Sequence, residues 1–101
     1  MKKIINGKKY DTDTATLLGD FCYSNPSDFK YYEEELYQKK TGEFFLYGKG
    51  GPRSPYAKVI GQNSWSGSAN IMPLTDAEAM SWAEKNLDVE DYEDIFGEVE
   101  E

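Results

Sequence analysis

The sequence contains no histidine and only one cysteine, Cys22. Without histidine, the common hydrolase triads and most transition-metal sites lack an essential residue. A single cysteine cannot form an internal disulfide, and without a CxxC motif we interpret Cys22 as a small, inert apolar filler. We therefore expect no enzymatic activity, no catalytic residues, no cofactor and no metal.

Long hydrophobic runs are also missing. No segment approaches the roughly 18–20 apolar residues that cross a bilayer. The start of the chain, residues 1–7, is basic but has no apolar signal-peptide core. These features predict a cytoplasmic protein with no membrane partner.

Basic residues are scarce in the last quarter of the chain. Residues 74–101 hold one Lys and eleven Asp/Glu, a net charge of −10, whereas residues 1–73 hold ten Lys/Arg and eight Asp/Glu, a net of +2. These two parts sum to the formal net charge of −8. Such an acidic segment repels nucleic acid and can attract basic, nucleic-acid-binding proteins. A purely solubilising acidic surface is an equally good interpretation.

The length and composition predict one α+β domain over residues 1–101. A chain of 101 residues fits a single domain, and 15% aromatic residues can fill its core. We expect a small antiparallel sheet of about three to five strands, with two hairpins, packed against C-terminal helices.

Turn residues place the first half of this fold. Asn6-Gly7 predicts a tight hairpin over residues 4–10. A short helix is expected over residues 15–18, ended by Gly19. Residues 25–28 read as a turn, and a second hairpin joins residues 29–39 to 43–47 through Gly42.

Aromatic residues of this second hairpin fall on both faces of the predicted sheet. By the two-residue period of strands, one set is Phe29, Tyr31, Tyr37, Phe45 and Tyr47, and the other is Tyr32, Leu36, Phe44 and Leu46. Either both faces are covered, or one face contacts a partner. Burial under the helices is the favoured alternative.

The second half begins with a Gly/Ser/Pro-rich connection over residues 48–67. Its sequence predicts one short helix from Ser54 to Gly61. A strand is expected at Ala69–Met72, closed by Pro73.

The acidic C-terminal part, residues 75–97, has the clearest helix signals. Thr75 and Glu78 form a capping box for a helix to about Leu87, with Trp82 docked on the sheet. Asp88 then caps a second helix that ends at Gly97. The apolar face of this second helix is Val89, Tyr92, Ile95 and Phe96, and the tail 98–101 is expected to fray.

Other motifs fail on spacing. The run 33–35 alternates faces on a strand and is interpreted as a solvated or cross-strand-paired edge. The acidic groups near residues 11–13 and 90–94 lack EF-hand spacing. Gly48–Gly51 has no Ser/Thr in a phosphate-loop frame. A basic aromatic patch for nucleic acid is disfavoured by the overall charge; its members would be Lys49, Arg53, Lys58, Tyr56 and Trp65.

Four segments carry a resemblance to known proteins. They are KKIINGKKYDT at residues 2–12, TGEFFLYG followed by GGP within 41–52, NSWSG at 63–67, and PLTDAEA continuing through WAE within 73–84. In this order they resemble a family of short acidic proteins from low-GC Gram-positive gut bacteria, their phages and their integrative elements. Relatives often carry Cys or His in the regions matching residues 20–32 and 56–62, whereas this chain keeps only Cys22.

That setting resembles phage-encoded inhibitors of the anti-CRISPR type. The resemblance implies stoichiometric binding to a CRISPR effector nuclease, with type II favoured, in the cytoplasm of the bacterial host. The acidic helix would act as a DNA mimic on the effector's basic surface, with aromatic anchors. Expected partner-binding residues are Glu84, Asp88, Glu90, Asp91, Glu93, Asp94, Tyr56 and Trp65, with exposed members of Tyr31, Tyr37 and Tyr47 as further anchors.

Two alternatives remain open at this point. One is a non-catalytic interaction adaptor of a phage or mobile element, which would use the aromatic sheet. The other is an autoregulatory nucleic-acid binder, which would use Lys2, Lys3, Lys8, Lys9 and the basic loop residues. The sequence is compatible with a monomer or a homodimer.

Overall fold

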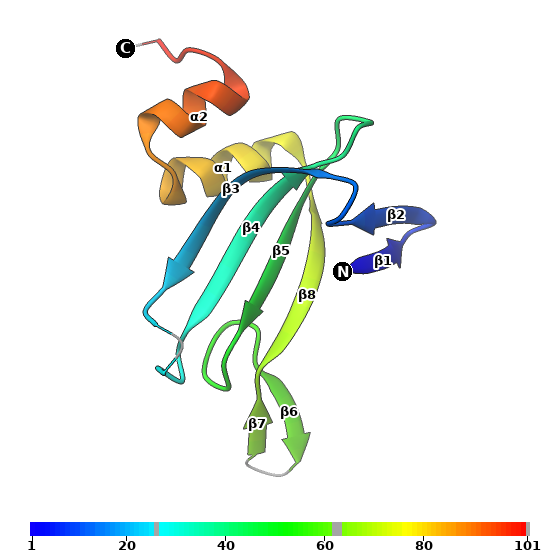
Figure 1. The fold of residues 1–101 in the computed structure, drawn as a ribbon, viewed down its shortest axis with the longest axis vertical. Helices are drawn as coiled ribbons and strands as arrows, with labels where there is room; N and C mark the ends of the chain where they lie inside the picture. Colours follow the sequence, from blue (N-terminus) through cyan, green and yellow to red (C-terminus); the bar gives the residue numbers. More distant parts are fainter. Residues whose placement is uncertain (26, 62–63, 101) are drawn as a thin grey trace.

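The computed structural model describes residues 1–25, 27–61 and 64–100, and over these it has an α+β fold (Figure 1). Four antiparallel strands form the main sheet, in the order β3 (Thr16–Tyr23), β4 (Tyr32–Gln38), β5 (Phe44–Gly50) and β8 (Ser68–Leu74). Two smaller hairpins pair β1 (Lys2–Ile5) with β2 (Lys8–Asp11), and β6 (Lys58–Gly61) with β7 (Ser64–Ser66). The helices α1 (Asp76–Asn86) and α2 (Val89–Phe96) follow at the C-terminal end. The predicted fold class is confirmed.

Both predicted hairpins form at the residues that favour their turns. Asn6 and Gly7 take φ angles of 50° and 76°, as a type I′ turn requires, and Ile5 pairs with Lys8. Gly42 has a φ of 96° in the connection from β4 to β5. The β4 strand begins at Tyr32 and not at Phe29, because residues 28–30 still belong to the turn before it.

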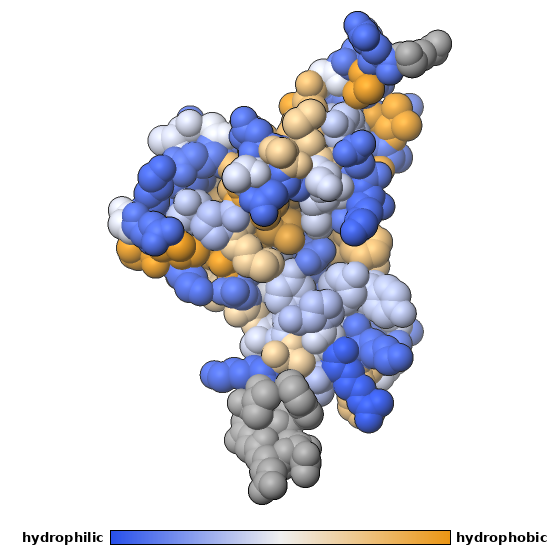
Figure 2. Space-filling view, turned by 180° about the vertical axis from the view of Figure 1, so that it is seen from behind, coloured by the Kyte–Doolittle hydropathy of each residue, from blue (hydrophilic) through white to orange (hydrophobic). Residues whose placement is uncertain are grey.

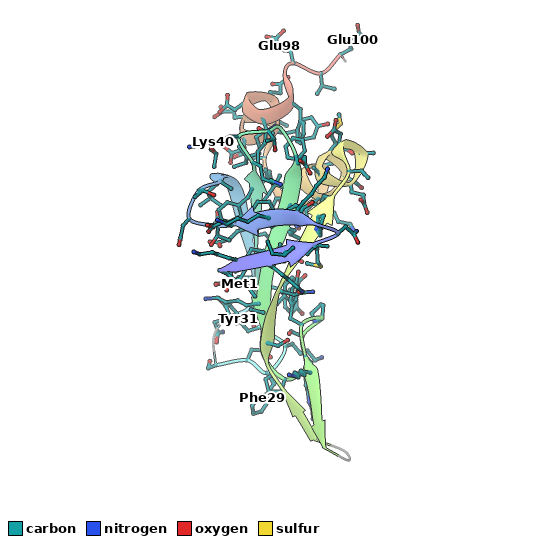
Figure 3. The ribbon with its side chains drawn as sticks, turned by 90° about the vertical axis from the view of Figure 1, so that its right-hand side faces the viewer. Met1, Phe29, Tyr31, Lys40, Glu98 and Glu100 are labelled. Carbon is teal, nitrogen blue, oxygen red and sulfur yellow. The ribbon has the colours of Figure 1, made fainter. Side chains whose placement is uncertain are left out.

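The two faces of the main sheet are covered by different parts of the chain. Tyr37, Phe45 and Ile71 pack with Tyr10 of the N-terminal hairpin, which runs crosswise over the long strands in Figure 3. On the opposite face, the core contains Leu36, Phe44, Leu46 and Ala79, with Ala79 supplied by α1. The expectation that both faces are covered is confirmed at their centres, but helices cover only one of them.

The predicted helix over residues 15–18 is wrong, because β3 begins at Thr16. Asp11 explains the local signal: its carboxylate accepts the Asp13 amide at 2.9 Å, and its carbonyl accepts the Ala15 amide at 3.1 Å. This makes a single turn, which is too short to outweigh pairing along a strand. From Thr16 to Tyr23 the chain instead pairs with β4, with a register shift between Leu17 and Gly19.

The position of Cys22 also corrects an expectation. It lies exposed on β3, at one edge of the sheet, and therefore fills no space in the core. Cys22 pairs with Glu33 of β4. It is not among the residues that pack against Tyr10 of the N-terminal hairpin, so that hairpin does not bury it. Its thiol is free.

The predicted helix from Ser54 to Gly61 is wrong as well. The Ser54 hydroxyl accepts the Tyr56 amide at 3.1 Å and the Ser54 carbonyl accepts the Ala57 amide at 3.1 Å, as at a helix start. The turn ends there, since β6 begins at Lys58 and pairs with β7. The next strand, β8, continues through Pro73, which an edge strand tolerates because its outer amide position needs no partner.

The C-terminal helices match their sequence signals. Thr75 accepts the Glu78 amide at 3.1 Å, and the Glu78 carboxylate accepts the Thr75 amide at 2.9 Å. Asp88 caps α2 by accepting the Asp91 amide at 2.8 Å. Trp82 packs on the helix-side core, which confirms its predicted docking on the sheet.

Candidate interaction surface

Aromatic contacts fix the position of α2. Ile95 and Phe96 pack against the helix-side core, and the Phe96 ring lies 5.6 Å from the Phe44 ring. At the junction of the helices, Leu87 packs over Gly19: a Cβ atom at Gly19 would stand 2.9 Å from the Leu87 methyls. These contacts fix the rotation of α2 about its axis, so the side opposite Ile95 and Phe96 faces solvent.

That face carries the predicted acidic residues. Glu90, Asp91 and Asp94 are exposed, while Glu93 is half-buried and accepts the Val99 amide at 3.0 Å. In the part of the chain that the structure describes, the ion pairs use Glu33, Glu43 and Asp11, and none includes a carboxylate of α2. The structure thus brings together Glu84, Asp88, Glu90, Asp91, Glu93 and Asp94 on α1, α2 and their junction.

Val89 is an exposed member of the predicted apolar face of α2. Its side chain is 72% exposed, although Ile95 and Phe96 of the same set are packed on the core. Val89 opens the helix, about 10 Å along the axis from Phe96 at 1.5 Å per residue, so it lies beyond the contact with Phe44. Val89 therefore belongs to the predicted apolar set, but its side chain lies at the surface.

A groove of about 300 Å³ lies where α1, α2 and the segment after α2 meet. Its charged lining comes from Glu84, Asp88 and Glu93. Its apolar lining comes from Leu87, Val89, Tyr92 and Val99. Figure 2 shows hydrophobic patches among hydrophilic residues over this end of the molecule, at the upper right.

The predicted aromatic anchors are not part of this surface. Tyr56 is only 8% exposed, which corrects its assignment as a contact residue. Its ring occupies the space beside Gly48, and its hydroxyl donates to Glu34. Tyr37 is also buried, Tyr31 and Tyr47 are half-buried, and the side chain of Trp65 lies outside those that the structure describes.

One polar cluster was missed by the sequence reasoning. One oxygen of the Glu34 carboxylate accepts Trp82 Nε1 at 3.0 Å, and the other accepts the Tyr56 hydroxyl. This carboxylate therefore joins β4 to α1 and to the turn at residues 52–56. The sequence did hold a signal for this cluster, since Glu34 and Leu36 are two positions apart and therefore lie on the same face of the strand. A carboxylate on a face that helices cover needs hydrogen-bond donors from the segments that cover it.

Burial shifts the titration of two tyrosines. Desolvation raises the pKa of Tyr37 to about 12, and its hydrogen bond to Glu35 acts in the same direction. The pKa of Tyr56 is raised further, first by desolvation and then by the hydrogen bond to Glu34. Both phenols are held neutral by the fold.

Tyr37 gives a testable pH dependence. The pKa of Tyr37 is about 12 in the folded state and 10 for an ordinary tyrosine, so the folded state binds the phenolic proton more tightly than the unfolded state does. The resulting contribution to stability is complete below pH 10 and is lost as the pH rises to 12. A shift of two units corresponds to about 2.7 kcal/mol. We expect the stability advantage of the wild type over Tyr37→Phe to fall by roughly this amount between pH 9 and 12 in urea unfolding.

The range below pH 9 is the internal control for this measurement. The Tyr37 phenol is neutral there in both the folded and the unfolded state, so the stability difference between the two proteins should be constant. A difference that also stays constant from pH 9 to 12 would contradict the assignment of the shift to Tyr37.

Comparisons with other proteins supply no relative from which a role for this surface could be taken. No protein family, curated protein or solved structure matches the chain. Over residues 1–25, 27–61 and 64–100, no group of three or more His, Cys, Asp or Glu is placed to hold a metal ion. No helix among these residues is long and apolar enough to cross a membrane.

Proposed function

We propose that this chain is a stoichiometric inhibitor of the anti-CRISPR type, which binds a type II CRISPR effector nuclease in the bacterial cytoplasm. It would act as a non-catalytic binding protein that blocks DNA loading or nuclease movement. The observation that carries this proposal is the acidic face of α2, which is held outward by the packing of Ile95 and Phe96.

Electrostatics supports a basic partner for this face. The carboxylates of Glu90, Asp91 and Asp94 are exposed and lack ion-pair partners within the described residues. A groove that neutralises phosphates with Lys and Arg would be attracted to them at long range, and this speeds association at low salt. Displacement of counterions would favour the complex in the way that it favours binding of DNA.

Order of addition tests the proposed step. Target-DNA cleavage by a purified type II effector is measured while this protein is added before or after the DNA. Inhibition confined to addition before DNA indicates that the protein occupies the DNA-loading surface. Equal inhibition in both orders indicates a block on nuclease movement. If the protein neither inhibits this effector nor co-purifies with other defence complexes, the proposed function is wrong.

Charge neutralisation tests the surface itself. In Asp91→Asn/Asp94→Asn, two exposed carboxylates of α2 become neutral amides of similar size. If each contributes about 0.7 kcal/mol to the complex, the half-inhibitory concentration rises about tenfold at low salt. The difference should shrink in 0.5 M NaCl, since salt screens charges at the surface.

Asp13→Asn/Asp20→Asn is the matched control. Both residues are exposed: Asp13 lies in the turn between β2 and β3, and Asp20 lies on β3. This double variant changes the net charge by the same amount as Asp91→Asn/Asp94→Asn. If the effector contacts the face of α2, inhibition by the control should stay within about twofold of the wild type. Equal effects of the two variants would mean that net charge, and not the face of α2, governs inhibition. Thermal unfolding confirms that each variant is folded.

A further inference from the structure

The groove between the helices combines charge with exposed apolar surface. Besides Val89, Val99 is 60% exposed, and both line the groove together with the half-buried Leu87 and Tyr92. Solubility alone would be served by polar residues at these exposed positions. Apolar surface framed by charge is instead typical of a contact site.

The carboxylates around this groove have accepting capacity left. One Asp88 oxygen accepts the Asp91 amide, and one Glu93 oxygen accepts the Val99 amide, which leaves the second oxygen of each. Glu84 is exposed on the last turn of α1. Within the described residues, none of the three forms an ion pair with a Lys or Arg.

We propose that this groove binds an arginine side chain, flanked by apolar residues, from a basic partner protein. In the complex of the proposed function, on which this assignment of the partner rests, that arginine belongs to the effector. Its apolar stem would pack on Leu87, Val89 and Val99, and its guanidinium would reach the carboxylates at the rim.

The size and chemistry of the groove select this occupant. A volume of about 300 Å³ is at the small end for ligand sites, so it suits one or two side chains and not a whole helix. Arginine combines a long apolar stem with a planar head that pairs with carboxylates and stacks on aromatic rings such as Tyr92. An aspartate or glutamate would be repelled here, and a purely apolar side chain would form no ion pair with the carboxylates of the groove.

A peptide titration tests the groove without the effector. The probe is acetyl-Leu-Arg-Leu-amide, and the matched probe carries citrulline, which keeps the shape of arginine without its charge. We expect NMR shifts at residues 84–99 with a dissociation constant near 1 mM, and at least about tenfold weaker binding of the citrulline peptide. Equal binding of the two peptides, or shifts elsewhere on the protein, would overturn the proposal.

Variants of the groove lining test the contribution of single residues. Val89→Ser and Glu84→Gln change exposed lining residues and should each weaken the arginine peptide about threefold or more. Asp13→Asn, at an exposed residue between β2 and β3 and outside the groove lining, is the control and should bind as the wild type does. Unchanged binding by both lining variants would overturn the proposal.

The results also distinguish this inference from the proposed function. Peptide binding without inhibition of an effector would refute the proposed function and support the arginine site. Inhibition that is unaffected by Val89→Ser and Glu84→Gln, together with no peptide binding, would refute the site alone. Light scattering of the free protein tests whether a second copy of this chain occupies the groove. A dimer that dissociates in Val89→Ser would assign the groove to that second copy and overturn the proposal.

Discussion

Replacing Phe45 by alanine is expected to lower the free energy of unfolding by about 3–5 kcal/mol. The Phe45 side chain has no exposed area, and its ring stacks on Tyr37 at 5.2 Å and meets Tyr10 edge-on at 5.5 Å. Alanine would leave a cavity between the sheet and the N-terminal hairpin. Since small domains are stable by only about 5–15 kcal/mol, a large part of the total would be lost.

Urea unfolding measures this loss as a lower midpoint with an unchanged slope. Phe29→Ala is the matched control, because it makes the same chemical change at a side chain that is 66% exposed. We expect the control to stay within about 0.5 kcal/mol of the wild type. Similar losses in the two variants would contradict the placement of Phe45 at the centre of the hairpin-side core.

Gly48→Ala is expected to destabilise the fold by about 3 kcal/mol. In the interior of a strand, the same substitution would ordinarily stabilise by about 0.5–1 kcal/mol, since glycine is the more flexible residue. Here the new Cβ atom would overlap with Cζ of the Tyr56 ring. The buried Tyr56 ring would have to move, and its hydrogen bond to Glu34 would break.

A double-mutant cycle isolates this clash. In a Tyr56→Ala background the obstructing ring is absent, so adding Gly48→Ala should cost less than about 0.5 kcal/mol. The coupling energy would then be at least about 2 kcal/mol, measured by chemical unfolding of the four proteins. Additive losses would mean that Tyr56 does not occupy the space beside Gly48.

Local sequence signals predicted those parts of the fold in which the decisive contacts are also local. The Asn6-Gly7 turn, the Thr75–Glu78 capping box and the Asp88 cap each depend on residues within four positions of one another. Residues 15–18 carried a competing local signal for a helix. The strand that begins there is decided by pairing with β4, where Leu17 lies opposite Tyr37, twenty residues away, and the sequence does not reveal that partner.

Charge predicted the acidic face, but not the groove beside it. The Asp88 cap, the Gly97 stop and the spacing of the apolar residues predicted one helix that carries Glu90, Asp91 and Asp94. The groove needs in addition that the chain turns after Gly97, so that Val99 approaches Glu93. Burial of Tyr56 likewise depends on a glycine in a neighbouring strand, Gly48, which has no side chain to fill the space. Such relations follow from packing between segments and not from any pattern within one of them.

Because α2 is short, its carboxylates have a fixed arrangement only in the folded protein. A helix of eight residues is too short to persist alone in water, and α2 is held in place through contacts such as that of Phe96 with Phe44 of β5. The strand that holds it is formed by residues about fifty positions earlier in the chain. In an unfolded molecule the same carboxylates form only a diffuse polyanion, with no fixed spacing. A partner that requires their fixed pattern therefore distinguishes folded from unfolded molecules, and misfolded copies do not compete for it.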